Sequence, residues 1–111
     1  MLRTHVLIAK HVLVAPRNLQ ITPRQSSYQA GDRIQCSAEG NPEPSYQWTD
    51  LVSGTVTQGA VLVISEDMID KSYAFKCVVT NHYNGTTREN FTAVIFSTAT
   101  GELPYQAASI F

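Results

Sequence analysis

The sequence has little of what marks several common classes of protein. Its 8 lysines and arginines are scattered and are balanced by 9 acidic residues, which gives a formal net charge of −1. The basic patch of a nucleic-acid-binding protein is therefore missing. No stretch reaches the roughly 20 apolar residues that span a bilayer. We expect no nucleic-acid partner and no direct membrane insertion by this segment.

Catalytic and metal-binding patterns are also lacking. The three histidines are far apart in the sequence: His5, His11 and His82. No Cys, Asp or Glu beside them has the spacing of a metal site, and no serine lies in a nucleophile-elbow pattern. We interpret the acidic residues Glu66, Asp67 and Asp70 as a solvated corner, with calcium binding as the alternative. We expect a protein that is not an enzyme and that holds no cofactor and no metal.

The length of 111 residues and the 43% share of hydrophobic residues fit one globular domain. A domain of this size buries roughly two-thirds of the surface of its unfolded chain. We expect residues 14–98 to form the domain. Residues 1–13 are then an N-terminal linker or strand extension, and residues 99–111 a C-terminal tail or linker.

Short segments rich in Val, Ile, Thr, Tyr and Phe alternate with clusters of turn-forming residues such as "QAGD", "EGNPEP" and "HYNG". This rhythm predicts an all-β protein. One stretch, "SEDMID", has the composition of a helical turn that Ser65 would cap. The expected strands are residues 12–15, 18–22, 33–38, 45–50, 60–65, 73–80 and 88–96.

Alternation within each expected strand predicts which side chains face inward, because successive side chains of a strand point to opposite faces. Together the inward residues predict one core between two layers. The inward set is Leu19, Ile21, Ile34, Cys36, Tyr46, Trp48, Leu62, Ile64, Phe75, Cys77, Phe91, Ala93 and Ile95.

Residues 14–98 contain a pattern that resembles the immunoglobulin superfamily. The tract "GNPEPSYQW" follows Cys36 and ends at Trp48, and the strand "VLVI" precedes the second cysteine, Cys77. Only 40 residues lie between the two cysteines, too few for the extra strands of a variable domain. The chain is therefore similar to the short I-set or C2-set domains of adhesion receptors. The resemblance implies an immunoglobulin-like two-sheet antiparallel β-sandwich with one inter-sheet disulfide.

The sequence departs from the family before the second cysteine. The usual "DxGxYxC" pattern is replaced by Lys71, Tyr73 and Phe75 at the Asp, Gly and Tyr positions. Phe75 lacks the hydroxyl that fastens the family's tyrosine corner to the backbone. We expect Tyr73 or Asp70 to take over that role.

A disulfide between Cys36 and Cys77 is expected, with Trp48 packed over it. Closing a loop of about 40 residues stabilises a domain by roughly 4 kcal/mol in the chain-entropy treatment. The alternative is a pair of buried free thiols, as in the cytosolic sarcomeric immunoglobulin domains that the sequence also resembles.

Two N-x-[ST] tracts favour the secretory route: "NGT" at Asn84 and "NFT" at Asn90. The first lies in a typical hairpin-tip dipeptide and should be exposed. Alternation places Asn90 on the face opposite Phe91. We expect at least one of the two to be glycosylated, and the alternative is that both are ordinary polar residues.

These observations predict a non-catalytic, extracellular immunoglobulin-like module, at the cell surface or secreted, that acts in adhesion or recognition within a larger protein. The expected partners are proteins, including neighbouring immunoglobulin domains and a second copy of the same protein, with glycans as an alternative ligand. Two other hypotheses stay open: an intracellular structural domain of the sarcomeric type, and a secreted immune effector.

Neither broad face of the predicted sandwich carries an aromatic anchor for a partner. One face is expected to present Gln47, Thr49, Lys76, Val78, Thr80, Asn90 and Thr92, and the other Arg33, Gln35, Ser37, Val61 and Val63. We therefore expect contact at the ends, with "HYNG" at one end and "EGNPEP" near the other. Tyr83 is the leading candidate for a binding residue, and His82 lies beside it.

Overall fold

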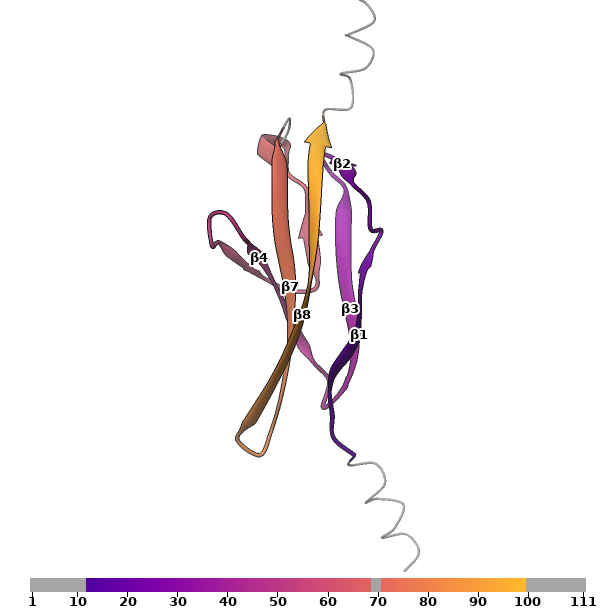
Figure 1. The fold of residues 1–111 in the computed structure, drawn as a ribbon, viewed down its shortest axis with the longest axis vertical. Helices are drawn as coiled ribbons and strands as arrows, with labels where there is room; N and C mark the ends of the chain where they lie inside the picture. The colour runs from indigo at the N-terminus through magenta and orange to yellow at the C-terminus, as the bar shows by residue number, and fades with distance from the viewer. Residues whose placement is uncertain (1–11, 69–70, 100–111) are drawn as a thin grey trace, which may run out of the picture.

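The computed structural model describes residues 12–68 and 71–99, which form eight strands and one helical turn (Figure 1). One turn of 3-10 helix, η1 (Glu66–Met68), lies between the sixth and seventh strands. The strands are β1 (Val14–Thr22), β2 (Ser27–Gln29), β3 (Arg33–Asn41), β4 (Ser45–Asp50), β5 (Val56–Gln58), β6 (Val61–Val63), β7 (Ser72–Tyr83) and β8 (Thr86–Ala99).

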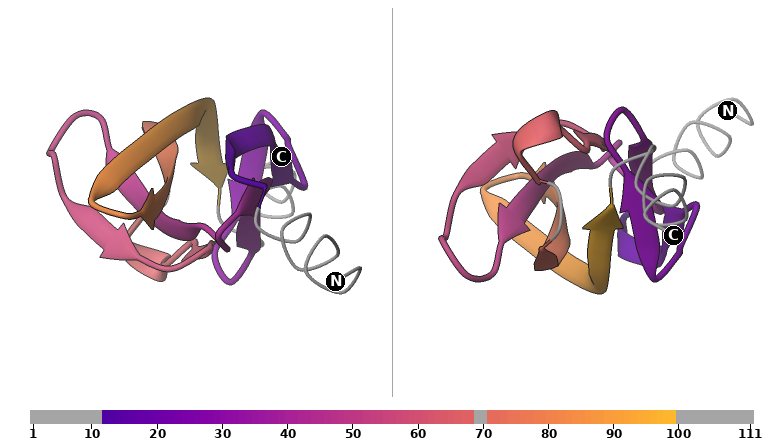
Figure 2. Two further views of the ribbon diagram at one scale, coloured as in Figure 1. Left: turned by 90° about the horizontal axis from the view of Figure 1, so that it is seen from below. Right: turned by 90° about the horizontal axis from the view of Figure 1, so that it is seen from above.

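The strands form two sheets, with the orders β1-β3-β6 and β2-β8-β7-β4-β5. The end-on views of Figure 2 show β1 and β3 on one side of the molecule and β4 and β7 on the other. The predicted two-sheet sandwich is confirmed. Its pairs are antiparallel except for β2, which runs parallel to β8. The sequence did not predict the short strands β2 and β5.

A disulfide and a tryptophan lie at the centre of the core. Cys36 on β3 and Cys77 on β7 are bonded, with their Cα atoms 6.5 Å apart, so the expected bond joins the two sheets. Trp48 is fully buried, and its Nε1 donates a hydrogen bond to the Ala60 carbonyl at 2.9 Å. The polar atom of the indole is therefore satisfied, and burial of the ring leaves no unpaired donor. The other buried side chains of the core cluster are Ile21, Tyr28, Ile34, Leu62, Ile64, Phe75, Val79, Val94 and Phe96.

The inward face of β8 differs from the expectation. Val94 and Phe96 are buried, whereas Ala93 is exposed and Phe91 and Ile95 are 61% and 75% exposed. The prediction that Phe91, Ala93 and Ile95 face inward was therefore wrong.

Strand pairing explains this outcome. Phe75 lies opposite Val94, and Cys77 lies opposite Thr92. Directly opposed residues share a face, so the even-numbered residues of β8 point toward the core. The tract "FTAVIF" is apolar at both odd and even positions, so alternation alone does not determine which set is buried.

Phe96 belongs to an aromatic cluster in the core. Its ring stacks on Phe75 and on Tyr73, each at a centroid distance of 5.9 Å, and Tyr28 meets it edge-on at 4.9 Å. The Tyr28 hydroxyl donates a hydrogen bond to the Pro23 carbonyl. The unpredicted strand β2 thus supplies one of the largest core side chains.

Thr98, near the end of β8, fastens the corner between η1 and β7. Its hydroxyl donates to the Met68 carbonyl, and its backbone N–H donates to the Lys71 carbonyl at 3.0 Å. Thr98 is only 4% exposed, so these bonds are shielded from water. Of the two residues expected to hold the corner, Tyr73 stacks in the aromatic cluster, and Asp70 lies outside the described residues.

Replacing Trp48 removes the largest buried side chain of the core. We expect Trp48→Ala to lower the free energy of unfolding by about 3 to 5 kcal/mol, because it leaves a cavity over the disulfide. Urea unfolding of the oxidised chain measures this effect. Val52→Ala is the control, since Val52 is 84% exposed and its replacement should change stability by no more than about 0.5 kcal/mol. Equal stabilities for the two variants would contradict the assigned role of Trp48.

Candidate binding surfaces

The β7–β8 hairpin projects beyond the sheets at the end of the sandwich where β1 begins (Figure 1). Asn84 and Gly85 form its turn, with φ angles of 55° and 82°. Positive φ at both central residues is what a two-residue type I′ turn requires, and Asn-Gly is the sequence that tolerates it best. The predicted hairpin tip is therefore present, with Tyr83 and Thr86 facing each other beside it.

The β3–β4 turn, "EGNPEP", lies at the same end as this hairpin, so its expected place near the opposite end was wrong. Strand direction explains why: β4 is antiparallel to β7, so β7 ends where β4 begins. The Asn81 side chain, 4% exposed, joins the segments by donating from Nδ2 to the carbonyls of Val14 at 2.8 Å and Pro42 at 3.0 Å.

Gly40 permits this close arrangement. A Cβ atom at that position would lie 2.9 Å from Cγ of Pro44 and 3.2 Å from Nδ2 of Asn81. The first distance is shorter than real Cβ contacts, so a side chain would displace the proline ring or the amide. The glycine of the "GNPEP" tract is therefore explained by packing.

A polar pocket of about 190 Å³ lies between the hairpin and the β3–β4 turn. Its described lining has three asparagine amides, a tyrosine and one guanidinium, with no carboxylate, so it offers hydrogen bonds and one positive charge. Tyr83 is 48% exposed at this site. The lining residues are Leu13, Asn41, Pro42, Asn81, Tyr83, Asn84, Thr86 and Arg88.

The structure does not bring the two predicted binding residues together. Tyr83 lines the polar pocket, whereas His82 is exposed and its Nδ1 lies 2.8 Å from Oγ1 of Thr87 across the hairpin. Successive residues of a strand point to opposite faces, so these side chains serve different surfaces. The sequence did not predict that Asn81 and Arg88 line this pocket, because no motif marks an isolated amide or arginine.

The second candidate surface is the outward side of β4, β5, β7 and β8, which we call the outer sheet face. Cross-strand pairing shows that Phe91 lies opposite Val78 on it, with Gln47 on the far side of Val78. The expectation that this face has no aromatic residue was therefore wrong. From the row of Ala74 to the row of Thr80, its members are Ser45, Gln47, Thr49, Val56, Gln58, Ala74, Lys76, Val78, Thr80, Glu89, Phe91, Ala93 and Ile95, and the row of His82 and Thr87 continues it toward the hairpin tip.

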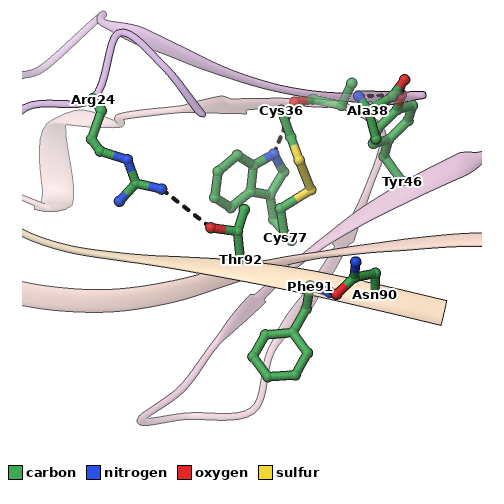
Figure 3. The surroundings of a disulfide bond; sticks show 10 residues. Arg24, Cys36, Ala38, Tyr46, Cys77, Asn90, Phe91 and Thr92 are labelled. Atoms are coloured by element: carbon green, nitrogen blue, oxygen red, sulfur yellow. Dashed lines mark hydrogen bonds between the residues drawn. A yellow bond between two sulfur atoms is a disulfide. The ribbon is translucent and has the colours of Figure 1, made fainter. Parts of the chain in front are cut away.

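Phe91 is the largest side chain of the outer sheet face. Figure 3 shows it on the side of β8 that points away from Cys77. The Lys76 ammonium nitrogen lies 5.2 Å from the centre of its ring, within the range of a cation–π interaction. The other sheet presents Arg33, Gln35, Ser37, Val61 and Val63 outward, as expected.

Asn90 and Thr92 do not lie on the outer sheet face, although alternation placed them there. The Asn90 amide Nδ2 donates to the Pro16 carbonyl at 3.1 Å, and its Oδ1 accepts the Phe91 N–H at 2.9 Å. Arg24 donates from Nη2 to the Thr92 hydroxyl at 3.2 Å (Figure 3). Both functional groups of this tract are thus engaged within the domain.

The acidic corner does not form a metal site among the described residues. Glu66 and Asp67 are exposed there, and a hydrogen bond from the Ser65 hydroxyl lowers the pKa of Asp67 from its usual value. Asp70 lies outside the described residues. Across residues 12–68 and 71–99, no three His, Cys, Asp or Glu side chains gather as metal ligands. None of the described helical structure is long and apolar enough to span a membrane.

Comparison with known proteins gives no matching family model. The chain is 30% identical over 77 residues to the cell adhesion molecule Dscam1 of Drosophila melanogaster. The aligned region covers 59% of this chain and 4% of Dscam1. It is 28% identical over 101 residues to neurofascin of Gallus gallus. That aligned region covers 81% of this chain and 7% of neurofascin. The chain thus spans only a small part of the length of these relatives.

A solved structure of the amphioxus IgVJ-C2 molecule has a TM-score of 0.61 and 26% identity to this chain, and the match covers 78% of this chain and 46% of that one. It supports the same fold that the strand order and the inter-sheet disulfide define. The resemblance to the immunoglobulin superfamily is confirmed, and the described part of the chain is an immunoglobulin-like domain.

Proposed function

We propose that this domain is a non-catalytic extracellular module that acts in adhesion or recognition through protein–protein contacts, as part of a larger protein. The disulfide between Cys36 and Cys77 carries the proposal. Such bonds persist in oxidising compartments and are rare in the cytosol. The likeness to a cell adhesion molecule, Dscam1, supports the role in adhesion.

The intracellular structural hypothesis is less favoured. It calls for two buried thiols in a reducing compartment, and the bonded cysteines argue against it.

Labelling of intact cells tests the extracellular placement. We expect an antibody against this domain to label unpermeabilised cells that express the full-length protein, or to detect the protein in their medium. A cytosolic protein stained in parallel is the control for membrane integrity. A signal that emerges only after permeabilisation would contradict the proposal.

We also propose that Asn84 carries an N-linked glycan and that Asn90 does not. Asn84 lies at the exposed tip of the hairpin. The acceptor nitrogen of Asn90 instead donates to the Pro16 carbonyl, and Thr92 of the same tract is held by Arg24. A glycan on this nitrogen would replace one of its two hydrogens next to the contact that Asn90 makes with β1.

Secretion of variants from eukaryotic cells measures which asparagine is used. We expect the Thr86→Ala variant to lose no mass on glycosidase treatment, because the change destroys the "NGT" tract but leaves the Asn84 turn in place. Thr86→Ser is the matched control and should keep the glycan. Thr92→Ala should leave the glycosylated mass unchanged. A glycan that survives Thr86→Ala and is lost in Thr92→Ala would show that the assignment is reversed.

A further inference from the structure

We propose that the first sugar of an N-linked glycan on Asn84 docks in the polar pocket and packs against the ring of Tyr83, so that it bridges the hairpin and the β3–β4 turn. The inference rests on the proposed extracellular role and on the proposed glycosylation of Asn84, and it names the site that the sugar occupies. It is carried by the position of the acceptor asparagine in the lining of the pocket and by the chemistry of the other lining residues.

One wall of the polar pocket is the inward face of the β7–β8 hairpin, where the hairpin leaves the core. Asn81 lies opposite Arg88 on this face. Two residues farther along β7, Tyr83 lies opposite Thr86. Directly opposed residues share a face of a sheet, as do residues two apart on one strand, so these four side chains line one surface. The end of β3, the turn after it and the residue before β1 supply the rest of the described lining.

Asn84 places the sugar at this pocket. It follows Tyr83 directly, has the positive φ of the first turn position and is itself a lining residue. The glycosidic bond forms at Nδ2 of Asn84, so the first sugar starts at the edge of the pocket. A ligand tethered beside its own site has an effective concentration on the order of millimolar. Weak contacts are therefore sufficient to hold the sugar there.

Tyr83 provides a surface on which a sugar ring can stack. The residue is 48% exposed, so much of its ring remains to be covered, and the ring has an apolar face with a polar hydroxyl at its edge. A sugar ring also has an apolar face, which is made of its C–H groups, and the N-acetyl group of the first sugar adds a methyl. Stacking the two faces removes apolar surface of both partners from water.

The polar groups of the lining match an uncharged ligand that is rich in hydroxyl groups. Asn81 uses both amide hydrogens on the carbonyls of Val14 and Pro42, which leaves its Oδ1 as an acceptor. The Arg88 guanidinium has only donors. Hydroxyl and acetamide groups of a sugar both donate and accept, so one ring satisfies both kinds of partner. The pocket of about 190 Å³ is smaller than the roughly 300 Å³ at which sites for drug-sized ligands begin, so it suits a single sugar.

A free acidic ligand fits this pocket less well. Arg88 is the single charged residue of the described lining, and it is exposed. An ion pair with an exposed arginine contributes little, because water and salt screen it. A glycan on Asn84 would in addition occupy the same space, so the tethered sugar is the occupant that the site favours.

Thermal unfolding of the oxidised 111-residue chain in three forms tests the docking. The forms share one sequence: exported by bacteria without a glycan, secreted by eukaryotic cells behind a foreign secretion signal, and the secreted form trimmed by an endoglycosidase to a single sugar. We expect both glycosylated forms to unfold at least about 3 °C above the unglycosylated form, as an aromatic contact of ordinary strength produces. Equal midpoints with and without the sugar, or a gain that disappears on trimming, would overturn the inference.

Variants of Tyr83 separate stacking from a general effect of glycosylation. In Tyr83→Ala the gain in midpoint on glycosylation should fall to less than half, whereas Tyr83→Phe should keep it, because the face of the ring is retained. His82→Ala is the matched control, since His82 is exposed on the opposite face of the same strand. The intact mass of each variant shows whether it carries the sugar. A gain that Tyr83→Ala leaves unchanged, or that His82→Ala lowers as much, would contradict the docking.

Proton NMR of the single-sugar form reports the position of the sugar directly. The ring current of an aromatic side chain shifts protons above its face upfield. We therefore expect at least one C–H or acetyl methyl resonance of the sugar to move upfield in the folded chain and to return to its usual position in Tyr83→Ala. Sugar resonances at their free-solution positions in the folded chain would refute the proposed contact.

These outcomes are distinguishable from a failure of the proposed function. A glycosylated Asn84 whose sugar neither stabilises the chain nor contacts Tyr83 would contradict only the docking. An Asn84 that eukaryotic cells leave unmodified would contradict the glycosylation proposal and the docking with it. Neither result alters the labelling of intact cells, which tests the extracellular role separately.

Discussion

The bond between Cys36 and Cys77, buried with Trp48, fixes the separation and alignment of the two sheets. It joins β3 to β7 across the core, and Trp48 lies directly opposite Cys77 on the neighbouring strand β4. The indole in turn reaches the Ala60 carbonyl, just before β6. This cluster therefore connects β3, β4 and β7 with the residue that precedes β6. It thereby determines which side chains lie on the faces of the sandwich and which turns lie at its ends.

The sequence predicted this centre because its parts are widely spaced and chemically distinctive. Two cysteines and the only tryptophan, set around a proline-rich turn, have few explanations other than a two-sheet core. Short strands without such markers were missed: β2 and β5 have three residues each, too few for alternation to be visible. The pairing of β2 with β8 depends on contacts far apart in the sequence, which local patterns do not contain.

The same limit explains the errors at the candidate sites. In β8, both faces have apolar residues, and only the pairing of Val94 with Phe75 shows which face is buried. Choosing the wrong set hid Phe91 in the predicted core and placed Asn90 on the outer sheet face. The polar pocket was missed for a related reason. Asn81 contacts the β3–β4 turn because β4 and β7 are antiparallel, so the end of β7 lies beside the start of β4. Sequence reasoning did place Asn84 and Tyr83 at the hairpin tip, because the signal for that turn is local.

The central claim is that the sheets are joined by one buried disulfide, and peptide mapping of the unreduced protein, isolated from its own cellular setting under thiol-blocking conditions, tests it most directly. The account predicts a single cross-linked peptide pair containing Cys36 and Cys77, no blocked cysteine, and an intact mass lower by two hydrogens than that of the reduced chain. Reduction should then lower the free energy of unfolding by roughly 4 kcal/mol. Two blocked cysteines in the native protein, with a stability that a reductant does not change, would contradict the account.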